Sequence, residues 1–143
     1  MTVRCEEDIL LAKVATVRRC VATIRRLGWE GQPPVEDWVR LDLTVRNLQR
    51  AVEACVNLAN HVIVANAWGL PGSANESIQL LVERGILGPT DLPIYRSMIG
   101  FRNIAVHNYR DIDEQIVTAI VRNHLKDLEN FANRVVHATT QSE

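Results

Sequence analysis

Apolar residues recur every three or four positions along most of the chain, which is the spacing that gathers side chains on one face of an α-helix. In the first segment they are separated by steps of 4, 3, 4 and 3: Leu10, Val14, Val17, Val21 and Ile24. The pattern predicts a helix over about residues 5–27. Gly28 and the Gly-Gln-Pro-Pro sequence at 31–34 would end it.

A second helix is predicted over about residues 36–68. Its apolar residues alternate steps of 4 and 3 for three heptads: Leu41, Val45, Leu48, Val52, Cys55, Ala59 and Val62. So regular a seam is typical of a helix that packs lengthwise against a partner. The seam offers more apolar surface than one small bundle needs, which favours dimerisation through the long helices.

Three more helices are predicted after this one. A short helix begins at Ser73 or Asn75, both good N-cap residues, and runs to about Arg84. The next begins at Thr90 or Asp91 and turns four apolar residues inward: Ile94, Met98, Phe101 and Ala105.

Residues 109–111 are predicted as a turn, and Asp113 as the cap of a last helix over about residues 113–137. We therefore expect residues 1–143 to form one all-α domain, an up-and-down bundle of four to five helices. Hydrophobic residues make up 47% and charged residues 23%, as in soluble globular proteins.

Several features favour a cytoplasmic protein. Cys5 and Cys20 would lie about 22 Å apart on the first helix, too far for a disulfide, and Cys55 falls on an apolar face. The N-terminus has acidic residues where a signal peptide has basic ones. No apolar run approaches the ~20 residues needed to cross a membrane. With a net charge of −1, nucleic-acid binding would require a local basic patch.

The segment GFRNIAVHNY, residues 100–109, contains the best candidates for catalytic side chains: Arg102, Asn103, His107 and Tyr109. On a continuous helix five residues turn the chain by about 500°, so Arg102 and His107 would point about 140° apart. Either the helix bends near Val106, or two copies of the segment face each other across a dimer.

These residue types suit metal-free cleavage of RNA, with no cofactor. A neutral imidazole accepts the proton of a ribose 2′-hydroxyl, which then attacks the adjacent phosphate. A guanidinium binds the phosphate and stabilises the charge that builds on it. Asn103 would orient the histidine or the phosphate, and Tyr109 would stack on a base or donate to the phosphate.

Other arginines are candidate RNA contacts. Arg96 and Arg110 flank the segment, and no acidic residue lies between Arg96 and Asp111, so we expect a positive local field there. A stripe on the first helix is better explained by the helix dipole and by solubility: Arg18, Arg19, Arg25 and Arg26. The remaining histidines lack the spacing of metal ligands: His61, His124 and His137.

Taken by types and spacing alone, Arg, Asn, His and Tyr are also ordinary residues at a helix C-terminus, and this structural explanation is the favoured one. However, residues 102–109 resemble the R-N-x-x-x-H-x-Y signature of HepT-type toxins, members of the HEPN ribonuclease group. The resemblance covers nearly the whole chain, including residues 48–53 and 79–87. One departure is the Ala-Asn-His-Val sequence around His61, which would alter substrate choice if it contributes to the cleft.

The resemblance implies an all-α homodimer whose two motifs line a cleft between protomers and cleave RNA without metal. Arg102 and His107 would be the catalytic pair, supported by Asn103. HepT toxins are paired with a minimal nucleotidyltransferase antitoxin, which transfers AMP to the motif tyrosine, here Tyr109. A bulky charged nucleotide beside Arg102 would block RNA. The alternative is a non-catalytic helical domain that binds a nucleotidyltransferase or a nucleotide.

Overall fold

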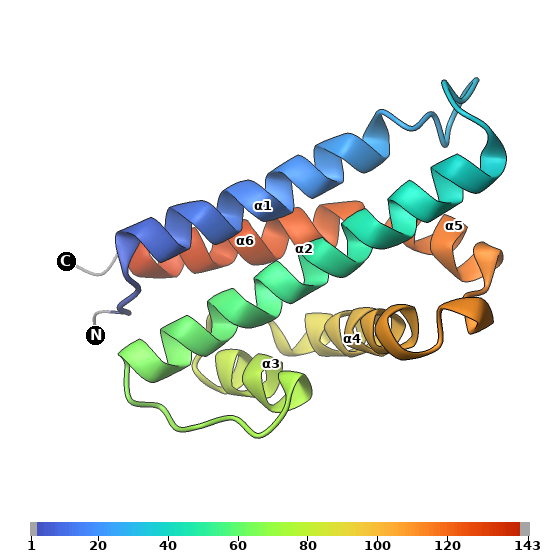
Figure 1. Ribbon diagram of the computed structural model, residues 1–143. Coiled ribbons are helices and arrows are strands. Elements are labelled where there is room, and N and C mark those ends of the chain that lie inside the picture. The colour runs from blue at the N-terminus through green and yellow to red at the C-terminus, as the bar shows by residue number, and fades with distance from the viewer. Residues whose placement is uncertain (1–2, 141–143) are drawn as a thin grey trace.

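The computed structural model describes residues 3–140, and this part of the chain is all-helical, as predicted, with six α-helices and two short 3-10 helices. The α-helices are α1 (Glu7–Arg25), α2 (Asp37–Ala65), α3 (Ala74–Glu83), α4 (Leu92–His107), α5 (Glu114–Asn123) and α6 (Leu125–Thr140). The 3-10 helices are η1 (Pro89–Asp91) and η2 (Tyr109–Asp111). In Figure 1, α1, α2 and α6 lie lengthwise beside one another, and α3 and α4 pack below α2.

Helix α2 is the centre of the fold, since it contacts each of the other five α-helices. The predicted seam is buried along its length except at Leu41, which is partly exposed. Residues outside the seam, such as Thr44 and Leu58, are fully buried as well. The seam therefore packs inside the protomer. Apart from Leu41, the seam has no exposed side chain, so the seam does not by itself indicate dimerisation.

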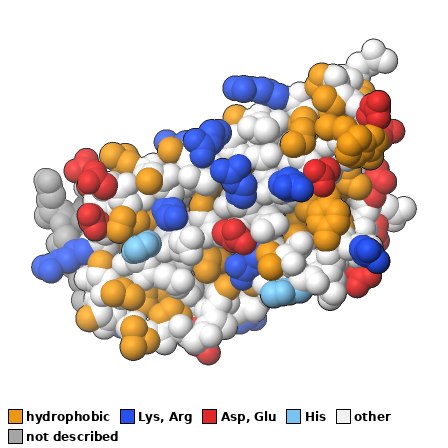
Figure 2. Space-filling model, viewed as in Figure 1, with side chains coloured by type: hydrophobic (Ala, Val, Ile, Leu, Met, Phe, Trp, Pro, Cys, Tyr) orange, Lys and Arg blue, Asp and Glu red, His pale blue; other side chains and the backbone are white. Residues whose placement is uncertain are grey.

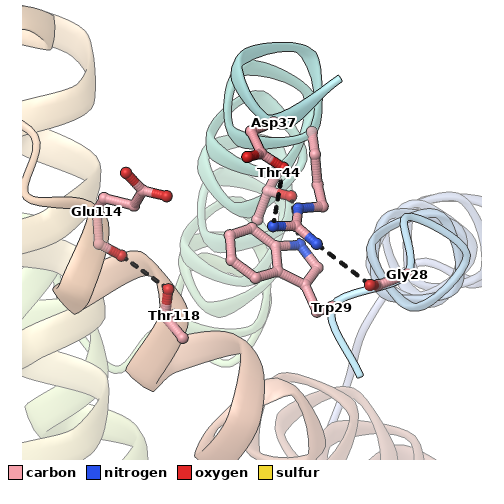
Figure 3. Close-up of polar contacts among 7 residues, drawn as sticks. Gly28, Trp29, Asp37, Thr44, Glu114 and Thr118 are labelled. Carbon is pink, nitrogen blue, oxygen red and sulfur yellow. Dashed lines mark hydrogen bonds and ion pairs between the residues drawn. The ribbon is translucent and has the colours of Figure 1, made fainter. Parts of the chain in front are cut away.

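Helix α1 follows its prediction closely, and all five apolar residues of the predicted stripe are buried. Gly28 ends the helical segment with a φ of +73°, and a Cβ atom there would lie 2.8 Å from the Cα of Pro33. This turn therefore requires glycine. The following loop is fixed by Trp29, whose indole N–H donates to the Thr44 hydroxyl at 2.9 Å. The Arg40 guanidinium stacks on the same indole, 4.4 Å from the ring centroid, and donates to the Gly28 carbonyl. Figure 3 shows Gly28, Trp29 and Thr44 gathered beside the start of α2.

The predicted last helix is wrong in one respect, because the chain breaks at His124 into α5 and α6. His124 leaves the helical conformation at φ −128° and ψ 3°, and its Nδ1 lies 2.9 Å from Oδ2 of Asp127 in the first turn of α6. The break changes the chain direction so that α6 packs along α1 while α5 contacts α2.

Two of the expected helix caps are confirmed: Ser73 accepts from the backbone N–H of Glu76, and Asp113 accepts from that of Gln115. Asp91 precedes α4 but makes no capping bond, and instead pairs with Arg134 at 3.1 Å. The three cysteines are free, as expected. No helix within residues 3–140 has the length and apolar character to cross a membrane.

Candidate active site

Helix α4 carries the motif and stays helical through His107. The backbone N–H of Asn108 donates to the carbonyl of Ile104 at 2.8 Å, so hydrogen bonding continues past Val106. The helix is therefore unbroken across Val106, which favours the alternative in which two copies of the segment face each other across a dimer. With regular geometry, Arg102 and His107 leave one helix in directions about 140° apart.

The two sides of α4 have different surroundings. The inner side is buried: Tyr95, Met98, Ile99, Phe101 and Ala105. Three of these were predicted to face the core, and Ile94 is partly buried. The outer side carries an exposed row with steps of 4, 3 and 4, which we call the outer stripe: Arg96, Gly100, Asn103 and His107. Asn103 and His107, four positions apart, thus share a face.

Arg102 lies at the border between these two sides and is partly buried. Its Nε atom is buried and has no hydrogen-bond partner. Among the described residues, no carboxylate lies within ion-pair distance of its guanidinium. Most buried charged groups are paired. A guanidinium held in place without a carboxylate remains available for an external anion such as a phosphate.

The side chains of His107 and Asn103 are exposed and make no hydrogen bond within residues 3–140. Within residues 3–140, neither Asn103 nor His107 is therefore hydrogen-bonded to Arg102. The protomer presents an imidazole and an amide on the outer stripe and a guanidinium beside it.

Tyr109 follows α4 in η2, and the residue is 46% exposed. Its hydroxyl donates to Oδ1 of Asp42 on α2, at 2.5 Å, while Nε of Arg46 lies 3.1 Å from the other Asp42 oxygen. The hydrogen bond from Tyr109, with the nearby Arg46, lowers the pKa of the Asp42 carboxyl. Partial burial and the bond to Asp42 raise the pKa of Tyr109.

Sequence reasoning missed Asp42. Asp42 is 67 positions from Tyr109 in the sequence, and its i, i+4 spacing from Arg46 is typical of an ordinary surface ion pair on a helix. The structure thus places beside Tyr109 a carboxylate that is paired with Arg46 and that the sequence around the motif does not contain. No local pattern in the sequence signals this contact.

The candidate RNA contacts differ in their surroundings. Arg110 is exposed and makes no ion pair with another described residue, while Arg96 donates to the Gln79 side chain at 2.9 Å. Two members of the α1 stripe are tied to α6: Arg18 donates to Asn133, and Arg25 pairs with Glu129. This supports a structural role for at least half of that stripe. Separately, Figure 2 shows that basic side chains are spread over the visible face of the molecule, with acidic side chains among them.

His61 is exposed on α2 and follows Asp42 by 19 positions, which is about 28 Å along the helix. The protomer thus separates it from Tyr109. Within residues 3–140, no three His, Cys, Asp or Glu side chains are grouped to hold a metal ion.

Comparisons with known proteins show the family to which the chain belongs. Residues 17–135 match the family model described as Ribonuclease HepT-like. The chain is 36% identical to the mRNA nuclease HepT of Shewanella oneidensis over 124 residues, which is 87% of this chain and 93% of that protein.

Two solved structures share the fold. One is the tri-AMPylated Shewanella oneidensis HEPN toxin in complex with MNT antitoxin, with a TM-score of 0.84, 33% identity, and coverage of 92% of this chain and 99% of that one. The other is a toxin–antitoxin complex with AMP-PNP, with a TM-score of 0.82, 33% identity, and coverage of 91% and 99%. This chain belongs to the HepT-like ribonuclease family.

Proposed function

We propose that this chain is a metal-independent endoribonuclease toxin whose active site combines the motifs of two protomers, and that a nucleotidyltransferase antitoxin silences it by transferring AMP to Tyr109. The observation that carries the proposal concerns two charged or titratable side chains of α4 that form no ion pair within residues 3–140. In a HepT-like chain, Arg102 and His107 have no ion-pair partner among the described residues and diverge on one continuous helix.

In the proposed reaction, the imidazole of His107 takes the proton of a ribose 2′-hydroxyl. The 2′-oxygen attacks the neighbouring phosphorus, and the bond to the 5′-oxygen of the next nucleotide breaks. The departing 5′-oxygen takes a proton from water or from the protonated His107, so the products are a 2′,3′-cyclic phosphate and a 5′-hydroxyl. Arg102 stabilises the charge on the phosphate oxygens, and Asn103 orients His107 or the phosphate. Arg110 and Arg96 would contact the RNA backbone.

The outer stripe supports a dimer. Gly100 is exposed in the middle of α4, and, apart from its chain neighbours and the adjoining helix backbone, no described atom lies within 4 Å of where its Cβ would be. Glycine inside a helix costs about 0.5–1 kcal/mol relative to alanine, and nothing in the described protomer requires it here. Close approach of a second α4 would explain it. Two-fold symmetry would then place Arg102 of one protomer in the same cleft as His107 of its partner.

Silencing by AMP is supported by the position of Tyr109 two residues after His107, and by the relatives. A Shewanella toxin of this fold is tri-AMPylated and in complex with an MNT antitoxin. A phosphodiester at Tyr109 would add negative charge and bulk beside the site where an RNA phosphate must bind. We also propose that the protein acts in the cytoplasm, where RNA and ATP are available.

Growth on expression of this chain alone tests the proposal. We expect arrest with the wild type, and normal growth with Arg102→Ala or His107→Ala at equal protein levels. Harmless expression of soluble, unmodified wild type would contradict the proposal and favour the non-catalytic helical interaction domain. Arrest that persists in both variants would exclude these residues from the toxic activity.

A further inference from the structure

The hydrogen bond between Tyr109 and Asp42 has no part in the proposed cleavage, yet it fixes the oxygen that the proposed silencing would modify. We propose that Asp42 orients the Tyr109 hydroxyl and accepts its proton when AMP is transferred to that oxygen. This inference rests on the proposed function and deepens its regulatory part.

The geometry suits this task. The hydroxyl donates its single proton to Oδ1 of Asp42 at 2.5 Å, so the lone pairs of the phenol oxygen remain free. The Asp42 carboxylate is itself oriented by Nε of Arg46 at 3.1 Å on its other oxygen. The Asp42 side chain is 35% exposed and the Tyr109 residue 46% exposed, so a nucleotide can approach the hydroxyl while its proton points at the carboxylate.

The transfer balances with ATP as the AMP donor. The phenol oxygen forms a bond to the α-phosphorus, the bond from that phosphorus to the β-bridging oxygen breaks, and pyrophosphate leaves. The phenol proton moves to Asp42 and from there to water, which reaches this partly exposed side chain. Asp42 is a weak base in the resting protein. It suffices because the phenol proton becomes strongly acidic as the new O–P bond forms.

Without a proton acceptor, reaction would depend on the phenolate. A tyrosine with an ordinary pKa near 10 is ionised to only about one part in a thousand at pH 7. Loss of Asp42 should therefore slow the transfer and make its rate rise about tenfold per pH unit below that pKa. A residue with a merely structural role would not change the shape of the pH profile.

The test uses purified wild type, Asp42→Asn and Asp37→Asn, each mixed with ATP and the MNT antitoxin of the Shewanella relative. Asp37 is the matched control, because it lies on the same helix and, within residues 3–140, pairs with Arg40 alone, and its side chain is 82% exposed. Mass spectrometry of the Tyr109 peptide gives initial rates of AMP addition from pH 6.5 to 9. Thermal unfolding establishes that each variant is folded.

We expect wild type and Asp37→Asn to react alike, with nearly flat profiles. Asp42→Asn should be about 100-fold or more slower at pH 7, with a rate that climbs with pH. Equal rates and flat profiles for all three proteins would overturn the role of Asp42 alone. Wild type that is never modified would instead contradict silencing at Tyr109, and the role of Asp42 with it.

Discussion

Arg102 is the residue on which the proposed chemistry depends most, because its guanidinium is partly buried yet has no ion-pair partner within residues 3–140. Removing one preorganised donor from a charge-stabilising site costs about 10²–10³-fold in rate. We predict a loss of that size in single-turnover RNA cleavage for Arg102→Ala. Arg102→Lys should recover only part of it, since an ammonium keeps the charge but not the planar fork.

Arg110 provides the contrast, because it is exposed in η2 and unpaired among the described residues. Arg110→Ala should weaken RNA binding. It should also reduce, by about one, the slope of the logarithm of the binding constant against the logarithm of the salt concentration, with little change in the cleavage rate at saturating RNA. If Arg102→Ala behaved in the same way as Arg110→Ala, Arg102 would be a binding residue and not a catalytic one.

The bond between Tyr109 and Asp42 gives a second prediction at this scale. The bond lowers the pKa of Asp42, so its contribution to stability is present above the ordinary carboxyl pKa and is lost as the pH falls through the lowered value. The raised pKa of Tyr109 means that its contribution is present below about pH 10 and is lost as the pH rises through the raised value.

Removing the hydroxyl in Tyr109→Phe should therefore raise the pKa of Asp42 toward its ordinary value. Carboxyl titration by NMR measures this, with Ser97→Ala on the exposed side of α4 as a control that leaves the pair intact. An Asp42 pKa that stays the same in Tyr109→Phe would show that the hydrogen bond does not form in solution.

Among the elements, α4 shows what periodicity predicts and what it leaves open. Apolar spacing correctly predicted that Met98, Phe101 and Ala105 face the core. It did not decide whether the helix bends at Val106, because spacing reports the period of a helix and not its curvature. The contact of η2 with α2 could not be predicted from the sequence either, since it joins residues far apart in the chain.

The break between α5 and α6 was missed for a related reason. Neither glycine nor proline occurs between residues 113 and 140, and apolar residues stay in helical phase across the break. Ile120 and Leu128, eight positions apart, would share a face of one continuous helix. Tertiary packing of α6 along α1, which no local pattern encodes, accounts for the change of direction.

Gly100 supplies a prediction for α4 as an element. In Gly100→Ala the new methyl group meets nothing in the described protomer, so the helix should gain about 0.5–1 kcal/mol. The same methyl group would obstruct a second helix that packs closely on the outer stripe. We therefore predict a higher thermal stability of the monomer and a weaker dimer, measured by thermal unfolding and sedimentation. A dimer of unchanged affinity would place the interface elsewhere.

At the scale of the whole molecule, the shared cleft predicts complementation between two inactive chains. In a mixed dimer of Arg102→Ala and His107→Ala, one cleft site retains Arg102 from one protomer and His107 from the other. The mixture should therefore regain part of the RNA cleavage that each variant lacks alone. No recovery in a mixed dimer of demonstrated composition would indicate that each protomer works with its own pair.

Cleavage of total cellular RNA in EDTA, by wild type beside His107→Ala, is the measurement to make first. We predict that wild type alone yields fragments ending in 2′,3′-cyclic phosphate, because the proposed reaction needs the imidazole and no metal. If folded wild type without AMP on Tyr109 leaves the RNA intact in EDTA, or if His107→Ala yields the same fragments at the same rate, the proposed active site is wrong.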